Sequence, residues 1–312
     1  MLYFICRSCY YYPMEQSMSQ NRGKTESGNQ SAIQAGKLSE TRSGMLCVLL
    51  ASVLFSIGGL CVKLISWSPL AINGTRNLIG ALVIGIFLLV THYKIRINFP
   101  VIIGAASTMG VTTLFVIANK LTTAANAIVL QYTAPVFVII FMTLIFRVRP
   151  GKRDIVTCAA VFSGVCLFFV DGIQTGNTLG NLAAILSGVC YAGVFMMNTA
   201  EGADALSSCF LGQLAAGIVF TPFCFRETNF NITTITTVFI LGIFQVGLAY
   251  ILLSIGIRRI NAVTASLITG LEPVMNPIWV ALFYGEIISP LAITGAVIVV
   301  GAIVIYNVSE KK

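Results

Sequence analysis

Charged residues are scarce in this chain. Asp, Glu, Lys and Arg make up only 10% of its 312 residues, while hydrophobic residues make up 57%. A soluble domain is about one quarter charged. So few charges cannot cover the surface of a water-soluble protein of this length. The composition therefore excludes an ordinary soluble protein and predicts a chain whose main solvent is lipid.

The side chains on which catalysis and metal binding depend are also rare. The chain has one histidine, His92, and no group of metal-ligating residues inside its apolar segments. Among nine cysteines, Cys6 and Cys9 have the spacing of a metal site, but no second pair or nearby histidine completes it. We therefore expect no enzyme activity, cofactor, metal site or disulfide framework. An intramembrane enzyme would become the better hypothesis if the structure placed His92 and a second acidic residue within hydrogen-bonding reach.

The net charge of +8 does not indicate nucleic-acid binding, because the basic residues lie between the apolar runs. Such a distribution is a signal of membrane topology. We expect no nucleic-acid partner, since no folded domain is left outside the membrane to bind one.

The first 44 residues differ from the rest of the chain. The stretch 14–44 is rich in Ser, Gln, Asn, Gly and Lys, and we predict that 1–44 is a disordered cytoplasmic tail. Its first twelve residues are too short and too interrupted for a signal peptide or a membrane span. Translation starting at Met14, Met18 or Met45 stays open.

From Met45 onward, apolar runs of about the 20 residues that a span needs alternate with short polar breaks. The fold class that this predicts is an all-α polytopic membrane protein with ten transmembrane helices. The predicted spans are 45–65, 70–91, 100–118, 122–146, 153–170, 179–198, 204–225, 236–257, 261–284 and 288–307. Because the loops are short, consecutive helices are expected to be antiparallel neighbours.

Most of the 19 Lys and Arg residues fall in the two tails and in the even-numbered loops. The opposite side holds only Lys63, Lys120 and Arg226, and Arg76 lies within the second span. Basic residues favour the cytoplasmic side of short loops. We therefore predict a multi-pass protein of the plasma membrane with both termini in the cytoplasm.

The two halves of the chain resemble each other in sequence. When Pro273 is aligned on Pro135, Arg258 lies on Lys120 and Leu282 on Leu144. A similar offset lays Tyr191 on Phe55. We predict two five-helix repeats, 45–170 and 171–312. Five is odd, so the halves would enter the membrane in opposite senses, and such inverted repeats are typical of transporters that alternate access to a midplane site.

Glu272 is the acidic residue that lies deep within a predicted span. A carboxyl group there must be paired with a cation, protonated or hydrated. Thr269, Asn276 and Trp279 share its helix face. Glu272 could therefore bind substrate or carry a coupling proton. Alternatively, it could receive backbone N–H groups or pair with a basic residue to fix the packing.

Prolines near the middle of two spans predict helix breaks. Pro135 interrupts the fourth span, and Pro273 and Pro277 interrupt the ninth, which we expect to be broken twice. Freed backbone carbonyls are tolerated at membrane depth where they face protein or a wet cavity.

Further polar residues are candidates for the same cavity. Arg76 could be a counter-ion for an anionic substrate group or for Glu272, or it could extend to the outer interface. Gln131, Tyr191 and Gln245 could line the cavity, although amides in membrane helices also join neighbouring helices.

Several segments resemble the EamA family of the drug/metabolite transporter superfamily. They include ANKLTTAANAIVLQYTAPVFV, then GLAYILLSIGIRRINAVTASLITGLEPVMNPIWVALFYGE, and SPLAITGAVIVVGAIVIY; together the resemblance covers about 45–307. It implies a ten-helix inverted-repeat transporter with both termini inside. It also implies secondary transport, often export, of metabolites such as amino acids. In the first repeat, Ala134 and Val148 stand where the second has Glu272 and Glu286.

The sequence thus predicts a secondary active transporter that exports a small metabolite by alternating access, with protons as a possible coupling ion. Its partners would be the solute and the lipid bilayer, and it would be a monomer or a homodimer. Two alternatives stay open. A membrane scaffold or receptor would have a dry, packed centre around Glu272, and a channel would have a continuous open pore.

Overall fold

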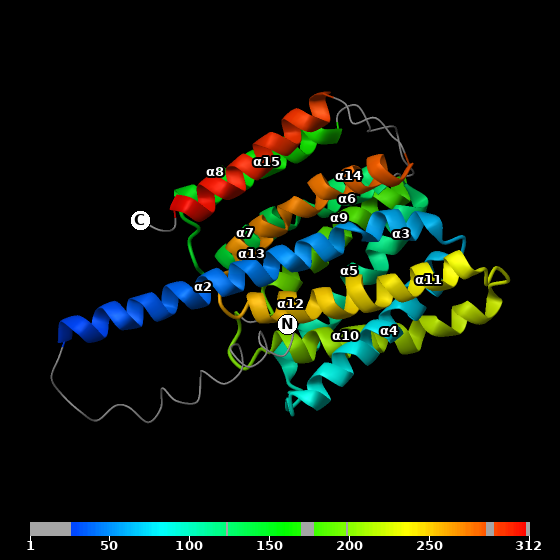
Figure 1. Cartoon of the computed structure of the whole chain (residues 1–312), viewed down its shortest axis with the longest axis horizontal. Coiled ribbons are helices and arrows are strands. Elements are labelled where there is room, and N and C mark those ends of the chain that lie inside the picture. Colours follow the sequence, from blue (N-terminus) through cyan, green and yellow to red (C-terminus); the bar gives the residue numbers. More distant parts are fainter. Residues whose placement is uncertain (1–25, 123, 170–177, 198, 285–289, 310–312) are drawn as a thin grey trace.

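The computed structural model describes residues 26–122, 124–169, 178–197, 199–284 and 290–309, and helices dominate this part of the chain (Figure 1). The helices are α2 (Glu26–Ser56), α3 (Gly58–Leu64), α4 (Pro69–Val90), α5 (Phe99–Leu121), α6 (Ala124–Gln131), α7 (Ala134–Leu144), α8 (Lys152–Phe169), α9 (Thr178–Phe195), α10 (Ala205–Phe220), η2 (Thr221–Arg226), α11 (Ile232–Ile240), η3 (Leu241–Leu248), α12 (Ala249–Gly256), α13 (Ala262–Ile268), η4 (Thr269–Leu271), α14 (Glu272–Tyr284) and α15 (Pro290–Ser309). Helical segments occupy each of the ten ranges predicted as spans.

The starts of these helices follow from local sequence. Ser68, Asn98, Asp204, Asn231 and Asn261 each accept a hydrogen bond from the backbone N–H three residues later. Their short polar side chains satisfy N–H groups that the first turn of a helix leaves without a partner.

The N-terminal segment differs from the prediction. Residues 1–25 lie outside the described part, but α2 already begins at Glu26, so the stretch 26–44 that we expected to be disordered is helical. The Ala, Gln, Lys, Glu, Leu and Arg residues of this stretch are good helix formers. They extend a helix that the apolar residues after Met45 anchor, and they project from the body of the protein (Figure 1).

Three of the predicted spans are interrupted near their middles. The first bends between α2 and α3 at Ile57. The fourth breaks at Tyr132 and Thr133, directly before Pro135 in the first turn of α7. The ninth tightens to a 3₁₀ turn, η4, directly before Glu272 and Pro273. Prolines are favoured in a first turn because its N–H groups have no helical partner.

The second break predicted for the ninth span is wrong, because α14 continues from Glu272 to Tyr284 through Pro277. A proline within a helix removes one backbone hydrogen bond, and the bonds on either side of Pro277 keep the backbone helical. The eighth span carries an unpredicted distortion instead. Its middle, η3, is π-helical between α11 and α12.

The contacts between helices of the two predicted halves form matching pairs. Helix α5 packs on α9, and α12 packs on α2; α10 packs on α5, and η3 packs on α4. If each helix is replaced by its counterpart in the other predicted half, α5 on α9 becomes α12 on α2, and α10 on α5 becomes η3 on α4. Two related halves would produce such matching contacts. The last helices of the halves, α8 and α15, lie together at one side of the molecule (Figure 1).

The described part contains six helical stretches long and apolar enough to cross a membrane. They are Ser39–Leu64, Pro69–Val90, Phe99–Leu121, Thr178–Phe195, Ala205–Arg226 and Ile232–Gly256. The fourth and ninth predicted spans are divided into shorter helices. The chain is therefore a polytopic membrane protein, and its count of ten spans stays a prediction.

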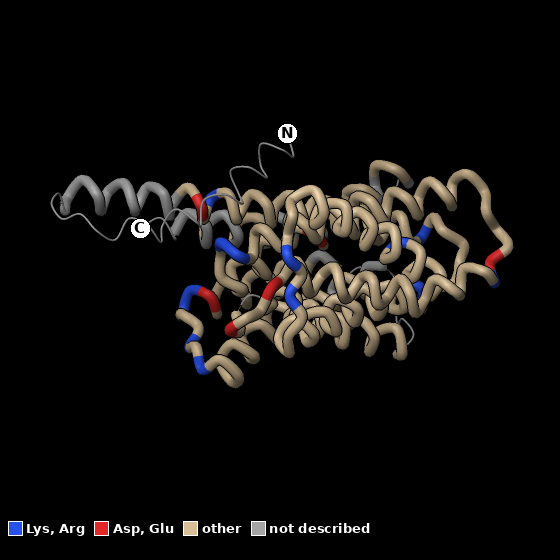
Figure 2. Tube along the Cα trace, turned by 90° about the horizontal axis from the view of Figure 1, so that it is seen from below, with Lys and Arg blue, Asp and Glu red and all other residues tan. Residues whose placement is uncertain are grey.

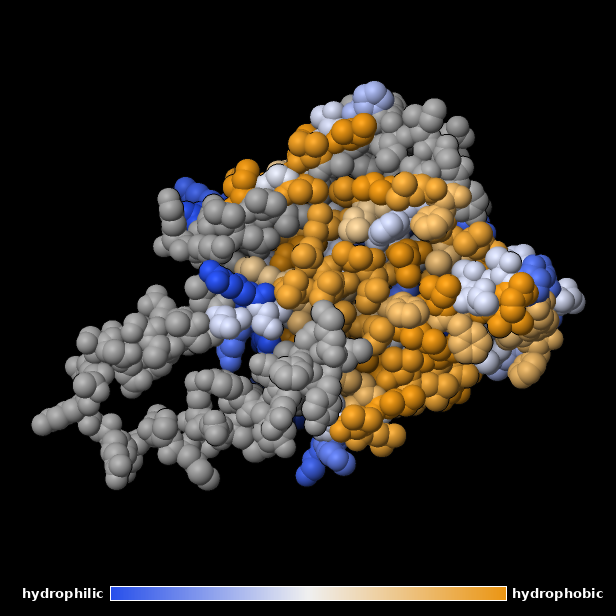
Figure 3. Space-filling model, viewed as in Figure 1, coloured by the Kyte–Doolittle hydropathy of each residue, from blue (hydrophilic) through white to orange (hydrophobic). Residues whose placement is uncertain are grey.

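The outer surface agrees with a lipid environment. Charged residues collect toward the two ends of the molecule (Figure 2), and an apolar surface covers the middle of the face drawn in Figure 3. Large apolar side chains on the surface of the protein, such as Leu89, Ile102 and Val156, are more than half exposed. In water, so large an exposed apolar area would cause aggregation.

Candidate functional site

A small polar cavity lies among helices from both halves of the chain. Its volume is about 20 Å³, and it is lined by Phe55, Arg76, Val111, Thr112, Phe115, Gln131, Tyr191, Gln245, Tyr250 and Glu272. A single water needs roughly 10–15 Å³. The space therefore holds about one water molecule, and it is far smaller than the roughly 300–1,000 Å³ of a ligand pocket.

The helix breaks direct Glu272 into this cavity. The η4 turn precedes Glu272, whose side chain is 5% exposed. The Tyr132 hydroxyl lies 3.0 Å from the carboxyl Oε2, and the Tyr191 hydroxyl lies 3.5 Å from the same atom. Tyr132 comes from the break between α6 and α7, so the two interrupted spans meet at this carboxyl group.

The Tyr132 hydroxyl has two acceptors for one proton. It also contacts the backbone carbonyl of Thr269, which can only accept a hydrogen bond. When the hydroxyl donates to that carbonyl, Glu272 can bond to Tyr132 only as a protonated carboxyl that donates. When Glu272 is ionised, the hydroxyl can donate to it instead. The cluster thus accommodates both protonation states of Glu272 with a hydrogen-bond rearrangement.

Arg76 lies inside the protein and does not extend to the membrane interface. Its side chain is 1% exposed; Nη1 donates to Gln245 Oε1 at 3.1 Å, and Nη2 donates to the Thr112 carbonyl at 2.9 Å. Among the described residues the one ion pair joins Arg258 and Asp204. Arg76 and Glu272 therefore line one cavity without forming an ion pair, and this excludes the pairing alternative for this state.

The two glutamines reach the cavity from distorted segments. Gln131 ends α6 and donates from Nε2 to Ser187 Oγ at 2.9 Å. Gln245 lies in the π-helical segment η3, and π-helical turns are frequent at functional sites. The close approach of α3 to Gln245 requires Gly58, where an added Cβ would lie 2.9 Å from Gln245 Nε2.

Three predicted site residues lie outside the cavity. The side chain of Thr269 bonds to the Ser266 carbonyl, and Trp279 Nε1 donates to Ser56 Oγ at 2.8 Å. Asn276 packs so closely on Gly59 that an added Cβ would lie 2.5 Å from its Nδ2. Asn276 and Trp279 therefore join α14 to the bend between α2 and α3.

The structure brings five of the eight predicted side chains together, namely Glu272, Arg76, Gln131, Tyr191 and Gln245. Sequence reasoning missed the apolar walls, Phe55 and Phe115, and the contact between Glu272 and Tyr132. Tyr132 lies beside Gln131 in the break before Pro135, which was a usable signal. Phe55 carried none by itself, although it aligns with Tyr191, against which its ring packs edge-on.

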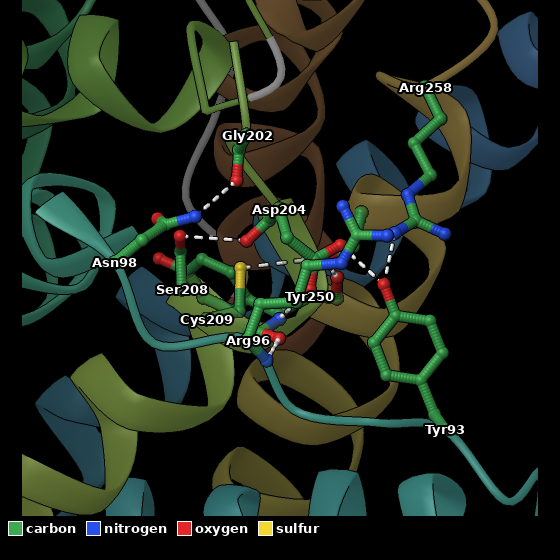
Figure 4. Close-up of polar contacts among 11 residues, drawn as sticks. Tyr93, Arg96, Asn98, Gly202, Asp204, Ser208, Cys209, Tyr250 and Arg258 are labelled. Atoms are coloured by element: carbon green, nitrogen blue, oxygen red, sulfur yellow. Dashed lines mark hydrogen bonds and ion pairs between the residues drawn. The ribbon is translucent and has the colours of Figure 1, made fainter. Parts of the chain in front are cut away.

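A charged network joins the start of α10 to the turn after α12 and to the segment after α4, as shown in Figure 4. Arg258, which follows α12, forms an ion pair with Asp204 at the start of α10, and the Tyr93 hydroxyl contacts both. Nearby, Asn98 donates to the Gly202 carbonyl at 2.7 Å. We name Tyr93, Asp204 and Arg258 the charged latch.

The charges of this latch persist across physiological pH. Burial raises the pKa of the Asp204 carboxyl, but the hydrogen bonds from Ser207 and Tyr93 and the charge of Arg258 outweigh burial and hold the pKa below its usual value. Burial and the hydrogen bond to Asp204 raise the pKa of Tyr93 to about 12. Asp204 therefore stays ionised and Tyr93 stays a donor near neutral pH.

Polar groups continue from the latch toward the cavity. Tyr250 and Ser254 are one turn apart in α12 and share one side of it, and Arg258 follows in the turn after this helix. Ser254 Oγ lies 3.4 Å from Cys209 Sγ, and Tyr250 lines the cavity. The latch therefore covers the end of a polar face that begins at the cavity.

A second network joins the loop before α4 to the loop before α11. Glu227 Oε1 accepts hydrogen bonds from the Ser68 backbone N–H at 2.9 Å and from its hydroxyl at 2.6 Å. Lys120 Nζ donates to the Ile65 carbonyl at 2.6 Å, and Trp67 Nε1 donates to the Asn229 carbonyl at 2.7 Å. We name this set the polar latch.

The two latches use corresponding positions of the predicted halves. Ser68 and Asp204 are both N-caps, of α4 and α10, and the offset that lays Tyr191 on Phe55 lays Asp204 on Ser68. The offset that aligns the two prolines lays Arg258 on Lys120. Corresponding positions of the two predicted halves therefore take part in both networks, although their partners differ.

Comparison with known proteins gives a consistent family. The profile of the EamA-like transporter family matches residues 42–170 and again residues 178–308. The uncharacterized inner membrane transporter YicL of Salmonella typhimurium is 22% identical over 299 residues, which cover 88% of this chain and 98% of that protein. A solved crystal structure shares the fold with a TM-score of 0.73 at 18% identity, over 86% of this chain and 98% of the other.

Proposed function

The chain belongs to the EamA-like transporter family, which confirms the resemblance seen in its sequence, and we propose that it is a secondary active transporter that exports a small metabolite by alternating access. Membrane transport of some solute follows from the family. The direction, the driving ion and the solute are the proposal. The observation that carries it is a polar cavity that is lined by Arg76 and Glu272 and by residues from both predicted halves.

The size of the cavity supports a change of conformation. About 20 Å³ cannot hold a metabolite, so the helices must separate before a solute can enter. The charged latch and the polar latch would then open in turn. The small volume of the cavity disfavours a channel with a continuous open pore, and the polar side chains around it disfavour a scaffold with a dry, packed centre.

Glu272 supports proton coupling. It is the acidic residue of the cavity, and its partners Tyr132 and Tyr191 are hydroxyls, which can accept or donate hydrogen bonds. A carboxyl group with such partners can gain and lose a proton without breaking an ion pair, because Glu272 forms none with the described residues in this state. The cost of carrying an ionised carboxylate at membrane depth favours protonation during transport.

We place the charged latch on the cytoplasmic side. The loops of the charged latch hold Lys94, Arg96 and Arg259 besides Arg258, whereas the polar latch has Lys120 as its basic residue. Basic residues favour the cytoplasm. Both termini would then be cytoplasmic, in a multi-pass protein of the cell membrane. Its partners are the solute, lipid and protons, and the protein acts as a monomer or a homodimer.

Metabolite profiling of cells and medium tests the proposal. Cells that produce the wild type are compared with cells that produce Glu272→Gln at equal membrane levels. Glu201→Gln, a change of an exposed acid in the loop before α10, is the matched control. We expect at least one metabolite to move into the medium with the wild type and the control but not with Glu272→Gln.

The same variants in proteoliposomes separate coupling from transport. Flux of the identified metabolite should follow an imposed pH gradient in the wild type and lose that dependence in Glu272→Gln. A normal gradient dependence in Glu272→Gln would contradict proton coupling through this residue. If the wild type moves no metabolite in cells or vesicles, the proposed export is wrong.

A further inference from the structure

The cavity contains a buried cation, Arg76, that forms no ion pair within the described part of the chain, although the carboxyl group of Glu272 lines the same cavity. Arg76 is 1% exposed, and its two protein contacts, Gln245 Oε1 and the Thr112 carbonyl, are neutral acceptors. The ion pair of the described residues is at the charged latch, at one end of the molecule. Burying a charge without a partner is costly, and an apolar side chain would fill the same position more favourably.

The guanidinium group also keeps unused hydrogen-bonding capacity. It has five N–H donors in a planar fork, and two of them form the bonds described above. Its Nε is buried and has no hydrogen-bond partner. Buried polar groups in proteins are nearly always bonded, so this N–H is available to a molecule in the cavity, either a water or a group of a bound solute.

The surroundings fix the position of this group. Gln245 holds Nη1 from the π-helical segment η3, and the Thr112 carbonyl holds Nη2 from α5. Thr112 Oγ1 bonds to the Thr108 carbonyl of its own helix and does not compete for the guanidinium. A guanidinium fixed at two nitrogens presents its remaining N–H groups in a rigid arrangement, which favours a planar two-oxygen anion.

The rest of the lining indicates what accompanies the anion. Phe55 packs edge-on against Tyr250, with ring centroids 5.0 Å apart, and edge-on against Tyr191 at 6.5 Å. Phe115 and Val111 add apolar surface beside Arg76. Apart from Arg76, the cavity offers no cationic side chain. One cation suits a singly charged group better than a phosphate dianion, and the aromatic rings suit an apolar body.

We propose that Arg76 is the anion-binding residue of the central cavity and that the solute is a small monocarboxylate with an apolar body. This inference rests on the proposed transport function and specifies its substrate class. The carboxylate would bind the Nε–H and the free N–H groups of Arg76 while Gln245 and Thr112 keep the guanidinium in place.

The test uses sets of compounds that share a carbon skeleton. Each set contains an amino acid, its deaminated acid, its amide and its decarboxylated amine, built on alanine, leucine and phenylalanine. Thermal unfolding of the purified full-length protein is measured with each compound. We expect both carboxylates of at least one set to raise the midpoint of unfolding, whereas the amide and the amine of that set should not.

Variants of Arg76 assign the effect to this residue. Arg76→Gln should weaken carboxylate binding by about 10- to 100-fold, which is the range for a lost charged hydrogen bond. Arg76→Lys keeps the charge but not the fork, so it should bind with an intermediate affinity, and it provides a second variant if Arg76→Gln does not fold. Lys63→Gln, which removes an exposed charge at the end of α3, is the control and should bind as the wild type does.

Three results would overturn the proposal. They are stabilisation by amides or amines equal to that by carboxylates, unchanged carboxylate binding in Arg76→Gln or Arg76→Lys, and no stabilisation by any carboxylate. Failure of the proposed binding site can be distinguished from failure of the proposed transport function. Carboxylate binding without flux in proteoliposomes would refute the transporter proposal and keep the site, whereas flux of an amine that does not depend on Arg76 would refute the site and keep transport.

Discussion

The charged latch offers the sharpest test of how one end of the protein closes. Asp204→Asn removes the carboxylate that pairs with Arg258. Asparagine is nearly the same size, and its amide oxygen can still accept the bond from the Ser207 backbone N–H that starts α10. The substitution therefore removes the charge while it keeps the helix cap.

The magnitude follows from the exposure of the two partners. A hydrogen bond to a charged group contributes about 1.5–3 kcal/mol. Asp204 is 1% exposed, but the side chain of Arg258 is 37% exposed, so solvent screens part of the attraction. We expect the closed end to lose about 1–2 kcal/mol, which corresponds to a factor of roughly 5–30 in the open fraction.

Native cysteines report on each end. Cys209 is fully buried behind the charged latch (Figure 4), and Cys61 is 7% exposed in α3, near the polar latch. Modification of each cysteine by N-ethylmaleimide is followed by peptide mass spectrometry on membranes. In Asp204→Asn, the modification rate of Cys209 should rise by about 5- to 30-fold, the factor worked out above, and that of Cys61 should not rise.

The matched control is Glu227→Gln, which removes a carboxylate from the polar latch and should expose Cys61 rather than Cys209. Faster modification of both cysteines in Asp204→Asn would mean a general loosening of the fold. An unchanged rate at Cys209 would mean that the ion pair does not hold this end closed. Either result refutes the reasoning.

Three further predictions concern pH, packing and the cavity. The Asp204 pKa is lowered in the folded state, so the latch is complete above the usual pKa of an aspartate, near 4, and is lost only as the pH falls through the lowered value. The hydrogen-exchange protection factors of the amides at the start of α10, which correct for the pH dependence of intrinsic exchange, should therefore stay constant from pH 8 to about 5, and lower protection within that range would contradict this. Gly74→Ala should lower the unfolding midpoint strongly, because its Cβ would lie 2.2 Å from backbone atoms of Phe220 and Thr221, whereas Gly85→Ala on the same helix meets only one side-chain atom, at 3.4 Å, and should change it little. Tyr132→Phe, which removes the hydroxyl shared by the Glu272 and Thr269 groups, should reduce proton-driven flux while membrane levels stay normal; unchanged flux in vesicles would assign that hydroxyl to packing alone.

Several parts of the site could be predicted because a polar residue inside an apolar run has few positions that avoid contact with lipid. Arg76, Gln131 and Glu272 cannot face lipid without a large cost, so their burial around one cavity follows from composition and spacing. The prolines likewise located the breaks before α7 and α14. These arguments use only the incompatibility of polar groups with hydrocarbon.

Other features depend on contacts that no local pattern carries. The π-helical segment that directs Gln245 contains no proline, and the bend at Ile57 has only two following glycines to indicate it. The continuity of α14 through Pro277 and the helical start of α2 at Glu26 were predicted wrongly. In each case neighbouring helices or the rest of the same helix outweighed the local signal.

The sequence by itself determined that this chain dissolves in lipid, where its helical segments fall, and which polar side chains must turn inward, because each of these follows from the cost of placing charge in hydrocarbon. Only the tertiary structure decided which partners those side chains have. It paired Glu272 with Tyr132, left Arg76 with neutral partners, and joined Arg258 to Asp204 at a closed end. Partners are chosen by the packing of helices that are distant in the chain, and that packing depends on the fit of whole surfaces.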